Sequence, residues 1–260
     1  MMYKNKPNGD VRPKKALGQH FLVDQDIARK IVSSLSSETS SIVEVGAGMG
    51  VLTQYLIQDN LDKLHVVEID GESIGYLKSA FPELKDRLIF GDFLKTDLAQ
   101  FGNNIGVIGN FPYNISSQIF FHILDYRNAV TEVVGMLQKE VAERISSGPG
   151  NKNYGILSVF LQAWYDIEYL FTVNEDVFNP PPKVKSAVVR LKRNNVQTLG
   201  CDEKAFAMIV KQSFNQRRKT LRNSLRPLLS PEIIEDEFFN KRPEQLSVAE
   251  FVELTKMLGG

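Results

Sequence analysis

Cysteine and histidine are scarce in this sequence, which limits the kinds of site it can form. Among 260 residues there is one cysteine, Cys201, and the three histidines are His20, His65 and His122. A single cysteine excludes an internal disulfide framework. The histidines are scattered without the spacing of metal ligands, so we expect no bound metal.

Long apolar runs are missing as well. No stretch approaches the roughly 18 consecutive apolar residues of a membrane-spanning helix. The segment MMYKNKPNGDVRPKK at positions 1–15 is basic and polar, unlike the apolar core of a secretory signal. We therefore expect a cytoplasmic protein that does not bind membranes. Nothing indicates an obligate protein partner, and we expect a monomer.

The charges balance overall but are unevenly distributed. There are 31 Lys and Arg against 31 Asp and Glu. Residues 1–20 nevertheless carry five basic residues and one acidic residue, and residues 183–226 carry twelve basic and two acidic residues. Such asymmetry is typical of a polyanion-binding surface beside an acidic body. A solvated basic face is the alternative interpretation.

Short apolar runs alternate with helical patterns along most of the chain. Asp24 is a candidate N-cap for a first helix. The strand-like runs lie at 41–45, 65–69, 88–90, 105–108 and 130–137, followed by two that we place antiparallel at the sheet edge, 167–173 and 187–191. The helical patterns lie at 51–58, 73–80, 116–126 and 138–147. This rhythm predicts an α/β fold with a doubly wound, mainly parallel sheet.

The chain is expected to divide near residue 195, in a polar stretch. From Asp202 to the end the pattern is helical, and prolines separate short helices. We predict a catalytic α/β domain at 1–195, which includes a basic arm at 1–20, and a small all-helical domain at 196–260.

A glycine-rich turn, Glu44-Val-Gly-Ala-Gly-Met-Gly50, follows the first predicted strand. Glycines there allow a tight turn and a close approach of backbone to a ligand. A dinucleotide-binding loop would have its third glycine at position 51, which is Val51. The spacing instead fits a cofactor without a pyrophosphate, such as S-adenosylmethionine. A purely structural turn is the alternative.

Carboxylates follow the next two strands. Glu68 could accept hydrogen bonds from both ribose hydroxyls of an adenosine cofactor. Asp92 could accept from an adenine amine, although a lone aspartate after a strand is more often a turn residue or a helix cap. Ligands of open α/β sheets bind at the carboxyl ends of the strands, so the three sites together favour a single ligand.

The string Gly109-Asn-Phe-Pro-Tyr-Asn114 directly follows the fourth strand. An exocyclic base amine is a poor nucleophile because its lone pair is delocalised into the ring. Acceptors on its two hydrogens, the Asn110 side-chain oxygen and the carbonyl before Pro112, would pull it toward tetrahedral geometry. Tyr113 offers a ring on which a flipped base can stack, worth about 1–3 kcal/mol. The alternative is a proline turn in a loop.

Several motifs occur in the order found in one known family. They are KALGQHFL at 15–22, EVGAGMG at 44–50, GNFPYNIS at 109–116, QKEVAER at 138–144, FNPPPKVKS at 178–186 and NQRRKTLRNSL at 215–225. On these the chain resembles the ribosomal RNA adenine dimethyltransferases, in particular the bacterial small-subunit branch. The resemblance implies a Rossmann-like enzyme that uses S-adenosylmethionine to dimethylate N6 of two adjacent adenosines near the 3′ end of small-subunit rRNA. It also implies a pre-ribosomal substrate and a role in subunit biogenesis.

The resemblance also implies roles for individual residues. The positions that match cofactor contacts are His20, Leu22, Gly46, Glu68, Asp92 and Asn110. Asn110 would touch the target amine too, and Phe178 would flank the target base opposite Tyr113. Taken alone, His20 is more typical of a surface histidine and Phe178 of core packing.

A basic helix is expected to hold the RNA. On a helical wheel for residues 210–226, Lys211, Arg218, Arg222 and Arg226 share one face, and the helix ends before Pro227. Lys14 and Lys15 of the arm would add further phosphate contacts. Two other functions stay open: a large-subunit rRNA dimethyltransferase that confers antibiotic resistance, and a mainly non-catalytic RNA-binding assembly factor.

Overall fold

Two compact units make up the described chain. The computed structural model describes residues 11–259 except 217, 232 and 234. One unit comprises the described residues up to Ala142 together with Glu168–Arg193. The other comprises Glu143–Ile167 together with the described residues from Asn194 onward. Residues 1–10 of the predicted basic arm and Arg217 of the basic segment lie outside the described residues.

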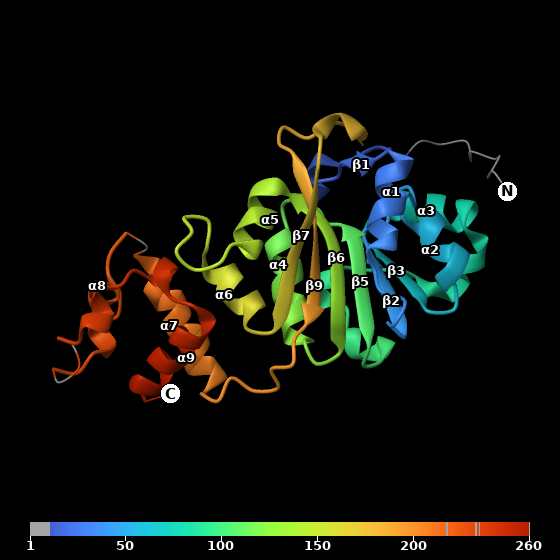
Figure 1. Cartoon of the computed structure of the whole chain (residues 1–260). Helices are drawn as coiled ribbons and strands as arrows, with labels where there is room; N and C mark the ends of the chain where they lie inside the picture. Colours follow the sequence, from blue (N-terminus) through green and yellow to red (C-terminus); the bar gives the residue numbers. More distant parts are fainter. Residues whose placement is uncertain (1–10, 217, 232, 234, 260) are drawn as a thin grey trace. The chain divides into compact units, whose positions relative to one another are not determined.

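A seven-stranded sheet forms the centre of the first unit (Figure 1). Its order is β4-β3-β2-β5-β6-β9-β7. The bounds are β2 (Ser41–Val45), β3 (Leu64–Glu68), β4 (Leu88–Phe90), β5 (Ile105–Asn110), β6 (Val130–Gln138), β7 (Tyr165–Val173) and β9 (Ser186–Arg193). The strands β4, β3, β2, β5 and β6 run parallel to one another, and β9 is antiparallel to β6. Nearly every residue of β2 and β5 is buried, as parallel strands covered on both faces require.

Helices pack against this sheet. They are α1 (Gln25–Ser33), α2 (Thr53–Asn60), α3 (Gly71–Ala80) and α4 (Ser116–Asp125). A further helix, α5 (Lys139–Ser146), begins at the end of the first unit and continues into the second. Ile31 of α1, Leu56 of α2 and Leu77 of α3 share one apolar cluster with residues of β2, β3, β5 and β6. On α4, the Phe120 ring packs edge to face on Phe111 at 5.8 Å. The doubly wound α/β fold predicted from the sequence is therefore confirmed.

Aspartate side chains fix where several helices begin. Asp24 accepts hydrogen bonds from the backbone of Asp26 and Ile27 at the start of α1, as predicted. Asp70 does the same for α3 through Glu72 N. Such caps satisfy amide groups that have no partner within the helix and contribute about 0.5–2 kcal/mol each.

The second unit is helical. Its helices are α6 (Ile156–Gln162), α7 (Glu203–Asn215), α8 (Leu221–Ser224) and α9 (Val248–Met257). Phenylalanine rings connect α6 and α9 to α7: Phe160 lies 6.2 Å from Phe206, and Phe214 lies 6.0 Å from Phe251. Among the described residues, no helix combines the length and the apolar character needed to cross a bilayer.

The strands and helices predicted in the α/β part lie within two residues of the observed bounds. Two features were not predicted. A small antiparallel sheet pairs β1 (Phe21–Leu22) with β8 (Phe178–Asn179), and α6 has an apolar sequence without helical periodicity. The segment Glu143–Ile167, which contains α6, groups with the second unit and not with the predicted catalytic domain.

The continuous helix predicted over 210–226 is wrong. The backbone leaves helical geometry at Gln216 (φ −120°, ψ 57°), and Thr220 is extended before α8 begins. Leu221 N donates to Lys241 O at 2.8 Å, so the chain after the break bonds to the segment around Lys241 and not to the preceding turn of α7. Apolar anchors at Phe214 and Leu221 are buried on either side of it. The helical wheel therefore does not place the basic side chains on one face.

Glycine substitutions should test how tightly the sheet is packed. A Cβ on Gly109 of β5 would lie 2.6 Å from the Val45 carbonyl oxygen of β2, and backbone there cannot yield. We expect Gly109→Ala to lower the free energy of unfolding by about 1–3 kcal/mol. In α3, Gly75 is exposed and a Cβ there meets no atom within 4 Å.

Gly75→Ala is the matched control, and it should raise stability by about 0.5–1 kcal/mol because alanine favours a helix interior. Urea denaturation measures both variants. Equal effects of the two substitutions would contradict the packing described here.

Candidate active site

A cavity lies where the carboxyl ends of β2, β3, β4 and β5 meet. The sheet order reverses between β2 and β5, and open α/β sheets bind ligands at such a point. The cavity has a volume of about 190 Å³, well above the roughly 10–15 Å³ that a cavity needs to hold one water. Its walls come from the loops after these strands and from residues 17–21. The cavity therefore has room for an organic ligand.

The turn after β2 presents backbone to this cavity. Gly46 and Gly48 have φ values of +67° and +55°, in the left-handed region that suits glycine. A Cβ on Gly48 would lie 2.7 Å from the Phe21 ring, whereas a Cβ on Gly46 would meet no atom within 4 Å. The space beside Gly46 belongs to the cavity, so a ligand can approach its backbone closely.

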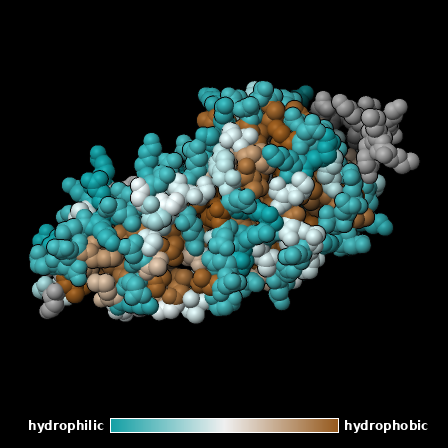
Figure 2. Space-filling view, viewed as in Figure 1, coloured by the Kyte–Doolittle hydropathy of each residue, from teal (hydrophilic) through white to brown (hydrophobic). Residues whose placement is uncertain are grey.

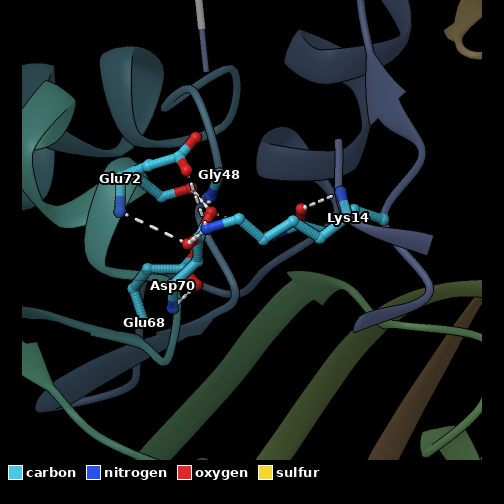
Figure 3. A network of polar contacts seen from close by, with 7 residues as sticks. Lys14, Gly48, Glu68, Asp70 and Glu72 are labelled. Carbon is cyan, nitrogen blue, oxygen red and sulfur yellow. Dashed lines mark hydrogen bonds and ion pairs between the residues drawn. The ribbon is translucent and has the colours of Figure 1, made fainter. Parts of the chain in front are cut away.

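Glu68, at the end of β3, is buried with 2% of its surface exposed. Its carboxylate accepts from Gly48 N at 2.9 Å and from Asp70 N at 2.8 Å (Figure 3). Burial raises the pKa of Glu68 above its ordinary value, and the backbone hydrogen bonds from Asp70 and Gly48 offset part of that rise. Each carboxylate oxygen has a second lone pair. Since Glu68 also lines the cavity, its carboxylate is placed beside the space that ligand hydroxyls would occupy.

Asp92 lines the same cavity while it caps a short helical turn. Its Oδ1 accepts from Leu94 N at 3.0 Å, and its side chain is 29% exposed. Asp92 is therefore a helix cap, which is one of the two interpretations of its sequence position. The other interpretation, an acceptor for an adenine amine, remains compatible with the structure, because Oδ2 lies 4.0 Å from the exposed Lys95 ammonium and can accept from a ligand.

Asn110 ends β5 and has its amide orientation fixed. Its Nδ2 donates to the His20 carbonyl oxygen at 2.8 Å. Since the amide nitrogen faces His20, the Oδ1 atom is the acceptor that remains for a substrate amine. Asn110 lines the cavity together with Glu68 and Asp92.

Tyr113 lies beside His20 and Ser186. Its ring stacks on the His20 ring with centroids 5.4 Å apart, and its hydroxyl bonds to the Ser186 hydroxyl. His20 Nδ1 donates to the Pro180 carbonyl oxygen at 2.8 Å, which fixes the imidazole. His20 and Tyr113 both line the cavity.

The remaining two predicted site residues, Leu22 and Phe178, are buried. Phe178 has 4% of its surface exposed and belongs to the apolar core with Leu22, to which it pairs across β1 and β8. Leu22 lines a smaller adjoining cavity with Gly46 and Asn110. Phe178 does not line the main cavity. The structure thus places Phe178 in core packing, the interpretation that its sequence alone favours.

Three residues of this region were not among the sequence candidates. Phe21 packs on Gly48, Ser186 bonds to Tyr113, and Asp70 bonds to Lys14. Phe21 and Ser186 fall within the family-like motifs, which was the available signal. Asp70 stands two residues after Glu68 but nothing in its neighbourhood indicated a partner 56 residues away.

The basic candidates fall into two groups. Lys15, Lys211 and Arg218 are exposed. Lys14 bonds instead to Asp70 and, at 3.2 Å, to Glu72. Arg222 donates to Glu235 at 2.8 Å and to Asn240 at 3.1 Å. The predicted roles of Lys14 and Arg222 as phosphate ligands therefore compete with ion pairs inside the protein.

No metal cluster is evident in the part of the chain that the structure describes, since no three His, Cys, Asp or Glu side chains are grouped to hold an ion.

Glu44, at the end of β2, is 1% exposed and accepts from Thr53 Oγ1 at 2.7 Å. Burial raises the pKa of Glu44 to about 8, and the Glu68 charge adds to the effect. The unfolded chain releases this proton near a pH of about 4.3. Between the two values the folded state holds more protons, so stability falls as pH rises.

Glu44→Gln removes this titration. Its free energy of unfolding should rise relative to the unsubstituted protein between about pH 5 and pH 8, by up to about 1.4 kcal/mol per pH unit. Urea titrations of both proteins across that range measure the difference. A difference that does not vary with pH would show that Glu44 is ionised throughout.

Comparisons with known proteins agree on one family. Residues 11–258 match the family model described as ribosomal RNA adenine dimethylase. "Ribosomal RNA small subunit methyltransferase A" of Parabacteroides distasonis is 60% identical, over 94% of this chain and 93% of that protein. The protein of the same name from Cytophaga hutchinsonii is 60% identical, over 96% and 98%. A solved dimethyladenosine transferase from Plasmodium falciparum superposes with a TM-score of 0.78 at 25% identity, over 92% of this chain and 98% of that one.

Proposed function

This chain belongs to the ribosomal RNA adenine dimethylase family, and we propose that it is the enzyme that dimethylates N6 of adenosines in small-subunit rRNA. S-adenosylmethionine is the methyl donor. One observation carries the proposal: the Asn110 amide, held by the His20 carbonyl, lies in the same cavity as Glu68 and Asp92. Cofactor and base acceptors thus converge at one sheet edge.

The residues present fit S-adenosylmethionine. The Glu68 carboxylate would accept the ribose hydroxyls with its remaining lone pairs, and Asp92 would accept the adenine amine. The open space at Gly46 would admit the methionine portion beside the backbone. His20 and Leu22 would lie at the opposite wall, because residues 17–21 line the main cavity and Leu22 the adjoining one.

The cofactor supplies an activated methyl group on its sulfonium. Asn110 Oδ1 and the carbonyl of Phe111 would accept the two hydrogens of the adenosine amine and localise its lone pair. Tyr113 would stack on the flipped base, with its ring fixed by the Ser186 hydroxyl. Positioning of this kind can supply about 7–11 kcal/mol of the barrier reduction in a displacement between two bound reactants. The methylated ammonium is acidic enough to lose its proton to water.

The small-subunit assignment rests on the relatives, which carry that name at 60% identity over nearly the whole chain. We further propose that two adjacent adenosines near the 3′ end are the targets, within a pre-ribosomal particle in the cytoplasm. The protein would act as a monomer and contribute to subunit biogenesis.

Mass spectrometry of both rRNAs, after incubation of unmodified 30S and 50S particles with protein and cofactor, tests this function. We expect N6,N6-dimethyladenosine in small-subunit rRNA only. Dimethylation of large-subunit rRNA would identify a resistance-type enzyme, and binding to 30S particles without methylation would identify an assembly factor.

Asn110→Ala should remove methyl transfer and little else. Loss of a positioned acceptor typically costs about a hundredfold or more in turnover, while the fold and the RNA affinity should persist. Asn103→Ala is the control, since Asn103 is exposed in the loop before β5 and does not line the cavity. Turnover that falls less than tenfold in Asn110→Ala would disprove its role at the amine.

Exposed basic residues of the second unit would bind rRNA phosphates. Lys211 lies on α7 and Arg218 in the break that follows it, and both are exposed; Lys15 would contribute from the arm. We expect Lys211→Ala with Arg218→Ala to weaken 30S binding severalfold and to flatten the salt dependence by about 0.7 log units per lost contact.

The control pair is Lys78→Ala with Lys85→Ala, which removes the same charge from exposed sites outside the basic segment. Affinity for S-adenosylhomocysteine, the demethylated cofactor, should stay unchanged in both pairs. Equal losses of RNA affinity would mean that net charge, and not this surface, determines binding.

A further inference from the structure

Residues 14–22 cover the cofactor cavity without belonging to the main sheet. Residues 17–21 line the cavity, and Phe21 and Leu22 pair with the two-residue strand β8. Two hydrogen bonds of His20 hold the segment, one to the end of β5 and one to the loop after β8. Asn110 Nδ2 donates to His20 O at 2.8 Å, and His20 Nδ1 donates to Pro180 O at 2.8 Å.

Lys14 fastens the same segment on the β3 side (Figure 3). Its ammonium bonds to the Asp70 carboxylate and lies 3.2 Å from Glu72 Oε1. Gln19 supports this contact: its Oε1 accepts from Lys14 N at 2.8 Å, and its Nε2 lies 3.5 Å from Asp70 Oδ2. The segment is therefore held at both sides of the cavity.

Asp70 is a buried acceptor that also contacts Glu68, the residue proposed to bind the cofactor ribose. Its side chain is 1% exposed, and its amide donates to Glu68 Oε1 at 2.8 Å. Burial alone would raise the pKa of Asp70, but hydrogen bonds from Lys14 and Ser73 bring it below its ordinary value. Removing the ammonium would leave a buried carboxylate short of its cation, two residues from Glu68.

We propose that Lys14 is a positioning residue, which clamps residues 14–22 over bound S-adenosylmethionine through Asp70 and Glu72. Its ammonium serves the cofactor site and not the RNA. The inference rests on the proposed function only in taking S-adenosylmethionine as the ligand of this cavity. Lys15, the next residue, is exposed and would serve the RNA, so the two neighbouring lysines have separable roles.

Calorimetric titration with S-adenosylhomocysteine, without RNA, tests the clamp. S-adenosylhomocysteine is a zwitterion, so added salt is expected to change its affinity mainly through charges within the protein. Lys14→Gln should weaken binding about three- to tenfold, as expected for a partly buried ion pair. Lys14→Arg should restore most of the affinity because it keeps the charge. Lys15→Gln should lower affinity for 30S particles but change that for S-adenosylhomocysteine less than twofold.

Two further readouts separate a clamp from general damage. Added salt should weaken ligand binding more in the unsubstituted protein than in Lys14→Gln. Steady-state kinetics should show a raised KM for cofactor with kcat within twofold. Equal ligand affinity in all four proteins would overturn the clamp alone, whereas no binding even to the unsubstituted protein would overturn the proposed function.

Discussion

The buried carboxylate of Glu68 links the parts of the proposed cofactor site to one another. It accepts from Gly48 in the glycine turn after β2 and from Asp70 at the start of α3. Asp70 in turn caps α3 and binds Lys14 of the N-terminal segment. Two loops, a helix start and the covering segment therefore depend on a single side chain. Substitution of Glu68 would therefore alter its contacts with both Gly48 and Asp70.

A second constraint sets the chemistry on the β5 side. The His20 carbonyl accepts the amide nitrogen of Asn110, so the covering segment determines which atom Asn110 offers to a substrate. The same segment carries the His20 ring that stacks on Tyr113. In the proposed function, placement of residues 14–22 over the cofactor and positioning of Asn110 and Tyr113 for the base would therefore be coupled. The contacts of Lys14 lie on the other side of the cavity, at Asp70 and Glu72, so its substitution is expected to affect cofactor affinity and not turnover.

The sequence predicted the sheet and the cavity because both depend on local patterns. Fully apolar strands such as Ser41–Val45 are distinct, and Glu68, Asp92 and Asn110 stand directly at strand ends. Local patterns do not show which side chains, far apart in the sequence, pair with one another. Counting charges assigned Lys14 and Arg222 to RNA, yet they pair with Asp70 and Glu235. Helical spacing likewise carries no sign of a break at Gln216, since the apolar anchors on each side fit either a straight or a broken helix.

The most direct test of this account is the affinity of Glu68→Gln for S-adenosylhomocysteine. Glutamine keeps the size of the side chain but replaces one acceptor oxygen with a donor that faces backbone N–H groups. We expect a loss of tenfold or more, equivalent to at least about 1.4 kcal/mol, in a protein whose circular dichroism spectrum is unchanged. An affinity within twofold of the unsubstituted protein would contradict the central place given to Glu68.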